Sequence, residues 1–263
     1  MDFGIEGRVA LVAASSQGLG KAVAEELAAE GTHLVMCARG QEALAEAVAS
    51  ADRRGPGEVL GIPADLSDAA QVAALADAAL ERFGRVDILV NNAGGPPAGP
   101  FEAHDAAAWQ AAVRLNLESA LQLTRAVLPG MKERGWGRIL NITSIAVKEP
   151  VDGLILSNSV RAAVTGFAKS LSNEVAAFGV TVNNVLPGFT RTARLDELAA
   201  VRAEAGGIST EEVEAGWNAA IPAGRLGEAR EFAAVVAFLA SERASYVTGV
   251  SVAVDGGRTR ALY

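Results

Sequence analysis

The stretch Val9-Ala10-Leu11-Val12-Ala13-Ala14-Ser15-Ser16-Gln17-Gly18-Leu19-Gly20 decides the fold, together with the helix-like Lys21-Ala22-Val23-Ala24-Glu25-Glu26-Leu27 that follows it. Residues 9–13 are apolar at every position, which is typical of a strand covered on both faces. In the turn at 14–20, small residues let backbone N–H groups and the positive end of the helix dipole point to one place, where a diphosphate can bind. The alternative is a tight strand-to-helix connection without a ligand.

Strand-length apolar runs alternate with alanine-rich segments of helical periodicity along the chain. The runs lie at 9–13, 33–38, 59–63, 88–91, 138–142, 181–186 and 250–254. The helical segments include 22–29, 69–82, 106–134, 160–178 and 229–240. This alternation predicts an α/β fold in one domain, residues 1–263: a Rossmann-type, doubly wound parallel sheet of about seven strands with helices on both faces.

The segment 191–223 interrupts this alternation before the helix at 229–240. It is long and helical in composition, and an insertion beside the carboxyl ends of the strands is where a substrate lid would lie. Its apolar residues predict a largely apolar substrate surface, or else they seat the lid on the domain. They are Leu195, Leu198, Val201, Ile208, Val213, Trp217 and Ile221.

Composition narrows the classes of function. With 263 residues, half of them apolar, the chain can bury a substantial core, and its net charge of −8 argues against nucleic acid and anionic membranes as partners. No apolar run is long enough to span a bilayer and no signal-peptide pattern precedes the first strand, so we expect a soluble, cytoplasmic protein. The single cysteine, Cys37, predicts a buried thiol, and His33 and His104 lack the spacing of a metal site.

The end of the second predicted strand, Met36-Cys37-Ala38-Arg39, bears on the choice of cofactor. Dinucleotide folds place there the group that reads the adenosine ribose: an acid binds the 2′-hydroxyl, whereas an arginine pairs with a 2′-phosphate. Arg39 therefore favours NADP(H) over NAD(H). The alternative is a surface arginine that caps the following helix.

Two further strand ends carry residues suited to the same ligand. Asp65-Leu66 follows the third strand, where it can bracket an adenine, and Asn91-Asn92-Ala93-Gly94-Gly95 follows the fourth, where small residues let a cofactor lie close. Four strand ends thus point to one extended ligand. The residues expected to bind it are Ala14, Ser16, Gln17, Gly18, Leu19, Gly20, Arg39, Asp65, Leu66, Asn92, Ala93 and Gly94.

Taken together and in order, these motifs resemble the short-chain dehydrogenase/reductase family over almost the whole chain, most closely its branch of 3-oxoacyl-acyl-carrier-protein reductases. The matching pieces are Gly18-Leu19-Gly20, Asp65-Leu66, Asn91-Asn92-Ala93-Gly94, Asn116, Asn141-Ile142-Thr143-Ser144, Pro187-Gly188 with Thr190 and Thr192, and Asp255-Gly256-Gly257. The resemblance adds Pro187, Gly188 and Thr190 to the cofactor site. Ala13-Ala14 replaces the Thr-Gly start of the family's first turn, so we expect tighter geometry there with binding retained.

The resemblance also implies a catalytic set in which two members are replaced. Asn116 and Ser144 match the family's Asn and Ser, but its Tyr-x-x-x-Lys falls on Ser157 and Arg161. A serine hydroxyl is a far weaker acid than a phenol, and Arg161 can bind ribose hydroxyls but is a poor proton relay. Loss of positioned acid catalysis typically costs about 10²–10⁴-fold in rate.

Three explanations of this replacement remain open. Ser144, Ser157 and Asn158 can hold the substrate while water supplies the proton, or another acid can serve, for which Lys148 and then Glu149 are the nearest candidates. In the third, the chain binds NADP(H) without turnover, as a sensor or partner subunit.

The leading expectation is an NADP(H)-dependent oxidoreductase that reduces a carbonyl or oxidises an alcohol, acting on a small, largely apolar substrate. Ala162 and Gly166, one helical turn apart, permit close helix packing. Because the matching helices form subunit contacts in the family, the resemblance implies a homotetramer or homodimer. The alternative is packing against the sheet within one subunit.

Overall fold

The structure, a computed structural model, describes residues 2–262 and contains a seven-stranded sheet in the order β3-β2-β1-β4-β5-β6-β7. Every pair of neighbouring strands is parallel. The strands are β1 (Val9–Val12), β2 (His33–Ala38), β3 (Val59–Pro63), β4 (Ile88–Asn91), β5 (Gly137–Ile142), β6 (Val180–Pro187) and β7 (Ser251–Val254). The predicted doubly wound α/β fold is confirmed, with strand ends shifted by one residue or less.

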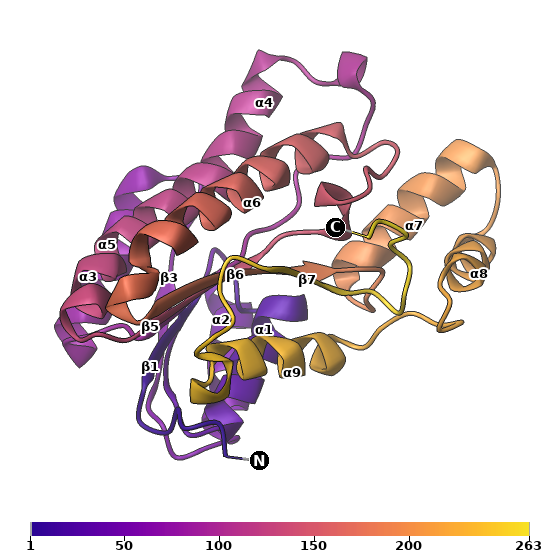
Figure 1. Cartoon of the computed structure of the whole chain (residues 1–263). Helices are drawn as coiled ribbons and strands as arrows, with labels where there is room; N and C mark the ends of the chain where they lie inside the picture. The colour runs from indigo at the N-terminus through magenta and orange to yellow at the C-terminus, as the bar shows by residue number, and fades with distance from the viewer. Residues whose placement is uncertain (1, 263) are drawn as a thin grey trace.

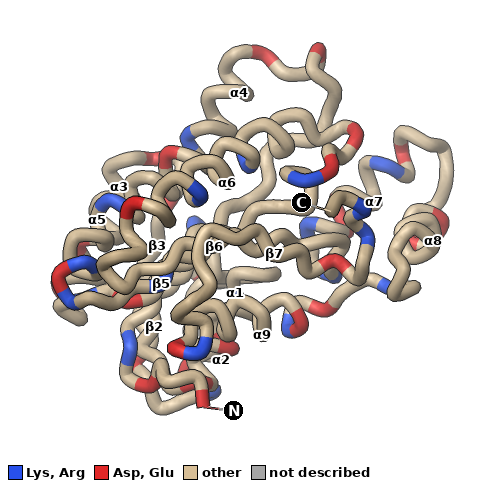
Figure 2. The backbone as a smooth tube through the Cα atoms, viewed as in Figure 1, with Lys and Arg blue, Asp and Glu red and all other residues tan. Residues whose placement is uncertain are grey.

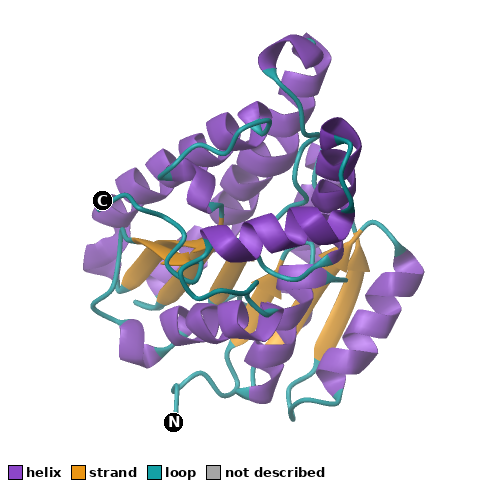
Figure 3. Cartoon of the chain, turned by 90° about the vertical axis from the view of Figure 1, so that its right-hand side faces the viewer, coloured by secondary structure: helices purple, strands orange, loops and turns teal. Residues whose placement is uncertain are grey.

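Helices cover both faces of the sheet (Figures 1 and 3). One face carries α1 (Gly18–Ala29), α2 (Gln41–Asp52) and α9 (Ala229–Ala240); the other carries α3 (Ala69–Phe83), α5 (Ser119–Glu133) and α6 (Ile155–Val175). The reason is visible in β1, where Ala10 and Val12 join the first apolar cluster while Leu11 joins the second. A strand that is apolar on both sides needs this double cover.

The helix predicted at 106–134 is continuous but not uniform. It consists of α4 (Ala106–Val113), a π-helical turn η2 (Arg114–Glu118) and α5. The extra residue per turn in η2 changes the direction of the side chains there, and Asn116 lies within it. π turns are frequent at functional sites.

Two helix starts differ from expectation. The first helix begins at Gly18 instead of residue 22, and α6 begins at Ile155 instead of residue 160. Gly18 and Gly20 interrupt the apolar periodicity at the first of these starts, and the polar run 157–159 interrupts it at the second. Ser157 therefore lies on α6 itself, one turn before Arg161.

The segment 191–223 forms two helices, α7 (Ala193–Gly206) and α8 (Thr210–Ala220), which stand apart from the layered body in Figure 1. A capping box between Ser209 and Glu212 begins α8. Most of the apolar residues of this segment pack on one another and on Phe189, whose ring stacks on Trp217 at 4.9 Å. They therefore mainly seat these helices, and Val201 and Ile208 are exposed.

Charge lies mostly outside the sheet, where acidic and basic residues are interspersed along the helices and loops (Figure 2). Arg138 on β5 is an exception: it is buried, and its guanidinium lies 4.4 Å from the Trp136 ring and 3.8 Å from Glu242. Cys37 is fully buried, which confirms the predicted buried thiol, and burial raises its pKa to about 11. Within residues 2–262, no helix combines the length and apolarity needed to cross a bilayer.

The turn after β1 is backbone-strained at Ala14, whose φ of +48° is the only positive value at a non-glycine residue in the described chain. The Asn92 side-chain amide holds the turn by donating to the Ala13 and Ala14 carbonyls at 3.2 and 3.1 Å. Ser15 adds a backbone hydrogen bond to the Cys37 carbonyl at 2.9 Å. The expected tight turn is thus present.

A row of amide side chains crosses four strands inside the sheet. Asn91 donates to Asn141 at 2.9 Å, Asn141 donates to Asn184 at 3.2 Å, and Asn184 donates to the hydroxyl of Ser251 at 3.1 Å. These residues are direct partners in the strand register. The row fixes that register, because a one-residue slip would leave buried amides unpaired.

We predict that Ala14→Gly stabilises the protein. A left-handed conformation costs an L-residue about 1–2 kcal/mol, which glycine avoids, while its greater freedom in the unfolded chain removes part of the gain. The free energy of unfolding from urea titration should rise by up to about 1 kcal/mol. The same change at Ala13, which is not strained, should lower it; a fall in both variants would contradict the strain at Ala14.

We also predict that Asn141→Ala destabilises the fold by roughly 1–3 kcal/mol, since it leaves the Asn184 amide oxygen buried without a partner among the described residues and leaves the Asn91 amide nitrogen only its 3.3 Å hydrogen bond to the Thr124 hydroxyl. Urea denaturation measures the loss. As a matched control, Gln110→Ala removes an exposed amide from α4 and should change stability by less than about 0.5 kcal/mol. Equal effects of the two variants would show that the row does not stabilise the sheet.

Candidate functional site

A cleft of about 840 Å³ opens at the carboxyl ends of the strands. Its volume is in the upper range for ligand pockets. The structure brings most of the predicted site residues to its lining: Ala14, Ser16, Gln17, Gly18, Leu19, Arg39, Asp65, Leu66, Asn92, Ala93, Gly94, Ser144, Ser157, Arg161, Pro187, Gly188 and Thr190. Gly20, Asn116 and Lys148 are not part of this lining.

The start of α1 fits a diphosphate. Gln17 is the N-cap, and within residues 2–262 no side chain caps the helix, so its first N–H groups remain available to a ligand. Gly18 adopts φ +56°, which favours glycine. Gly20 lies below the cleft, where an added Cβ would stand 2.3 Å from the Ala14 oxygen and 2.7 Å from the Asn92 amide nitrogen. Glycine there allows the turn to close.

Arg39 lies exposed at one end of the cleft. Among the described residues, no hydrogen bond or ion pair engages its guanidinium, and α2 begins at the N-cap Gly40 without a side-chain cap. The helix-capping alternative for Arg39 therefore finds no support. Its free guanidinium suits a phosphate, because arginine can donate two parallel hydrogen bonds to it.

Asp65, which lines the same end, is held by its own loop. Its carboxylate accepts the Ser67 backbone N–H at 2.8 Å and the Ser67 hydroxyl at 2.7 Å, and these hydrogen bonds lower the pKa of Asp65. Asp65 is therefore anionic at neutral pH and fixed in orientation.

Two hydroxyl groups line the other end of the cleft. The Ser144 oxygen accepts the Ala146 N–H at 3.1 Å, and the Ser157 oxygen accepts the Nε–H of Arg161 at 3.2 Å. A hydroxyl that accepts a hydrogen bond keeps its own hydrogen for a third group. Both serines can therefore donate to an oxygen atom in the cleft.

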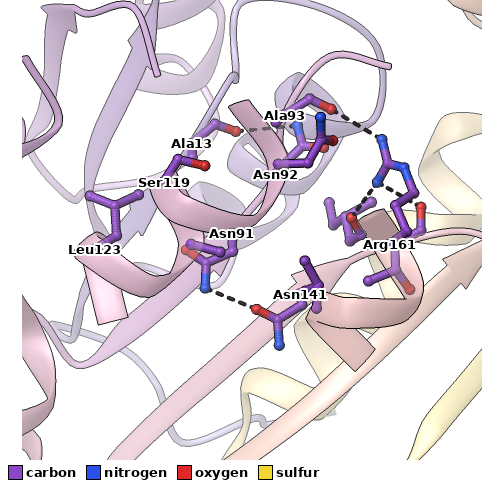
Figure 4. A pocket seen from close by; sticks show the side chains of 13 residues that line it. Ala13, Asn91, Asn92, Ala93, Ser119, Leu123, Asn141 and Arg161 are labelled. Carbon is purple, nitrogen blue, oxygen red and sulfur yellow. Dashed lines mark hydrogen bonds between the residues drawn. The ribbon is translucent and has the colours of Figure 1, made fainter. Parts of the chain in front are cut away.

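Arg161 joins the ends of β4 and β5 (Figure 4). Its Nη1 donates to the Ile142 and Thr143 carbonyls at 2.9 Å each, and its Nη2 donates to the Ala93 carbonyl at 3.4 Å. Burial lowers the pKa of Arg161 to about 10, and the charge of Arg194 contributes further. The guanidinium is thus first a clamp between strands, and only part of its hydrogen-bonding capacity remains for a ribose.

Behind Arg161 lies a small cavity of about 10 Å³, lined in part by Asn91, Asn116 and Thr143. One side-chain oxygen of each of these three residues is buried and has no hydrogen-bond partner among the described residues. The volume and the polar lining suit a single water molecule. Asn116, whose amide nitrogen donates to the Ala112 carbonyl at 3.3 Å, therefore faces this cavity and not the cleft.

The remaining candidates from the sequence lie elsewhere. Lys148 ends a short 3₁₀ turn outside the cleft lining. Glu149 accepts the Arg260 N–H at 3.2 Å and pairs with Arg258 at 3.5 Å, so it anchors the C-terminal segment. Asn158, also outside the lining, donates to the Val151 carbonyl at 3.0 Å. The cradle expected from Ser144, Ser157 and Asn158 thus contains the two serines only.

Sequence reasoning missed Arg194, which lies at the start of α7 and lines the cleft. In the sequence it is one of several arginines in a helical, charged segment, so no pattern distinguishes it. Val151 and Leu154, before α6, were missed for a similar reason. Of the apolar residues expected in the lid, Leu195 and Leu198 reach the cleft.

Comparison with known proteins agrees with this geometry. Residues 13–259 match the family described as "Enoyl-(Acyl carrier protein) reductase". The 3-oxoacyl-[acyl-carrier-protein] reductase of Haemophilus influenzae is 37% identical over 96% of this chain and 98% of its own length, and that of Escherichia coli is 36% identical over 96% and 97%.

Solved structures agree as well. The L-sorbose reductase of Gluconobacter frateurii, in complex with NADPH and L-sorbose, superposes with a TM-score of 0.94 at 33% identity over the whole of both chains. A variant of the actinorhodin polyketide ketoreductase with NADPH gives a TM-score of 0.92 at 35% identity, covering 97% of this chain and 98% of that one. Because the family match spans nearly the entire chain, as the motifs predicted, this protein belongs to the short-chain dehydrogenase/reductase family of oxidoreductases.

Proposed function

We propose that this protein is an NADP(H)-dependent oxidoreductase that reduces a carbonyl group or oxidises an alcohol, in the manner of 3-oxoacyl-acyl-carrier-protein reductases. The observation that carries the proposal is that one cleft joins the phosphate-binding turn and Arg39 to the hydroxyls of Ser144 and Ser157. A nicotinamide cofactor bound along this cleft would supply or accept the hydride.

The choice of NADP(H) rests on Arg39. Its guanidinium is free of partners among the described residues and lies on the cleft beside Gly40 and Ala43, where a 2′-phosphate would add charge for it to pair with. NADPH is also the cofactor named for the L-sorbose reductase and the actinorhodin ketoreductase.

In the proposed reaction, Ser144 and Ser157 donate hydrogen bonds to the substrate oxygen. Arg161 polarises Ser157 through its Nε–H and remains positively charged at neutral pH, because even its lowered pKa is about 10. Charge that develops on the oxygen is therefore stabilised without a strong acid. Water supplies the proton in this scheme, as the first explanation from the sequence has it.

The alternative function, NADP(H) binding without turnover, is favoured by one observation: most N–H groups of the Arg161 guanidinium donate to backbone carbonyls and to Ser157. A site built this way holds its shape but relays protons poorly. Activity assays distinguish the two functions.

Assembly and location stay predictions. Ala162 and Gly166 are exposed on α6, and an added Cβ at Gly166 would meet open space, so these residues do not pack against the sheet. This supports their use in a homodimer or homotetramer. A cytoplasmic location remains the expectation.

We predict that Arg39→Asp removes the preference for NADPH. The carboxylate would repel the 2′-phosphate, so the Kd for NADPH from fluorescence titration should rise at least about tenfold, while that for NADH should stay equal or fall. Arg53→Asp, the same charge change at an exposed residue after α2, is the control and should leave both values unchanged. An unaltered preference in Arg39→Asp would show that Arg39 does not read the ribose.

We predict that Ser144→Ala lowers kcat/KM about 10²-fold in NADPH-dependent reduction of a carbonyl panel that includes 3-oxoacyl thioesters, with the Kd for NADPH unchanged.

On the same panel, the double variant Ser157→Tyr with Arg161→Lys should reduce the native activity, because lysine cannot replace the hydrogen bonds of Arg161 to the carbonyls at the end of β5. A large gain on 3-oxoacyl substrates would instead identify an eroded reductase. Lys148→Ala tests the alternative proton donor. If the wild-type protein is inactive on the whole panel, binding without turnover is favoured.

A further inference from the structure

Arg194 reaches from the start of α7 across the cleft to the loop after β4. Its Nη2 donates to the Pro96 carbonyl at 2.9 Å, and its guanidinium lies against Gly95, where an added Cβ would stand 3.0 Å from Nε. Glycine at 95 thus leaves room for the guanidinium at the wall of the cleft. Arg194 is positioned by specific contacts and is not a freely moving surface side chain.

The Arg194 guanidinium keeps hydrogen-bonding capacity for a ligand. Nη1 pairs with Glu197 at 3.0 Å, whereas Nε has no acceptor among the described residues. Glu197 lies one turn further along α7 with 66% of its side chain exposed, and it does not line the cleft. The ion pair is therefore screened by solvent, and the Nε–H of Arg194 remains available to a ligand.

This end of the cleft is electropositive. The ionisable residues that line the cleft, within the described chain, are Arg39, Asp65, Arg161 and Arg194. The single carboxylate, Asp65, lies with Arg39 at the other end. Arg161 is bonded only to neutral acceptors, and Arg194 is near enough for its charge to lower the pKa of Arg161. Two cations without a lining carboxylate favour an anionic ligand.

Apolar side chains stand beside these cations. Leu195 and Leu198 follow Arg194 on α7, and Val151 and Leu154 lie before α6 near Ser157; all four line the cleft. A ligand that satisfies both features carries a negative group and an apolar chain.

We propose that Arg194 binds a carboxylate on the substrate, so that the enzyme acts on carbonyl acids with an apolar chain and not on neutral ketones. The carbonyl would lie at Ser144 and Ser157, the carboxylate at Arg194, and the chain against the leucines of α7. This inference rests on the proposed function and names its substrate class. The diphosphate of the cofactor offers the same oxyanion chemistry, so the test separates the two sources.

The test measures binding to the NADP⁺-loaded protein by isothermal titration calorimetry. The probes are butanoate, hexanoate and octanoate, each compared with the amide of the same chain length. In wild type the carboxylates should bind at least about tenfold more tightly than the amides, with affinity rising with chain length. Arg194→Gln should abolish this difference while the Kd for NADP⁺ stays within about twofold.

Arg191→Gln is the matched control, since Arg191 precedes α7, pairs with Glu214 and Glu228, and lies outside the cleft lining. It should retain the carboxylate preference. Equal or undetectable affinity of the wild-type protein for the carboxylates and the amides would overturn the proposal. It would also be overturned if the main defect of Arg194→Gln is weaker NADP⁺ binding, because Arg194 would then bind the cofactor.

Kinetics separate this inference from the proposed function. With NADPH, 2-oxohexanoate should have a KM at least about tenfold below that of its methyl ester, and Arg194→Gln should equalise the two. If the protein binds carboxylates through Arg194 but reduces no carbonyl, the carboxylate site stands and the proposed reductase function fails. If it reduces carbonyls with equal KM for acid and ester, the reductase function stands and the carboxylate site fails.

Discussion

The partly buried guanidinium of Arg161 is the constraint on which the site depends. A cation partly removed from water must be given acceptors, and here the carbonyl ends of β4 and β5 supply them. These contacts connect the ends of β4 and β5 to α6, and the hydrogen bond from Nε orients Ser157. Arg161 therefore stabilises the structure at this end of the cleft in addition to lining it.

Much of the fold could be predicted from the sequence, because buried parallel strands and amphipathic helices have different periodicities and alternate along most of the chain, with one interruption at 191–223. The convergence of Gly18, Arg39 and Asp65 on one cleft was also predictable, because in such a sheet the residues after each strand meet at one edge. Predicting that these residues lie together required no information about side-chain contacts.

The contacts themselves could not be predicted. Three of the four acceptors of Arg161 are backbone carbonyls, which every residue possesses. The hydrogen bond from Arg194 to Pro96 joins segments 98 residues apart. Lys148 is close to Ser144 in the chain, yet the turn that follows Ser144 leaves it outside the cleft. The π turn around Asn116 is likewise invisible in a pattern that reads as one long helix.

The amide row of the sheet also has an electrical consequence. From Asn91 through Asn141 to Asn184, each side chain donates toward the next strand, so their dipoles point the same way and add. The row ends on the oxygen of Asn91, which has no partner among the described residues and belongs to a residue that, like Arg161, lines the small cavity. The residue at the negative end of this transverse dipole and Arg161 therefore both line the small cavity, and the orientation of the row favours a positive charge there.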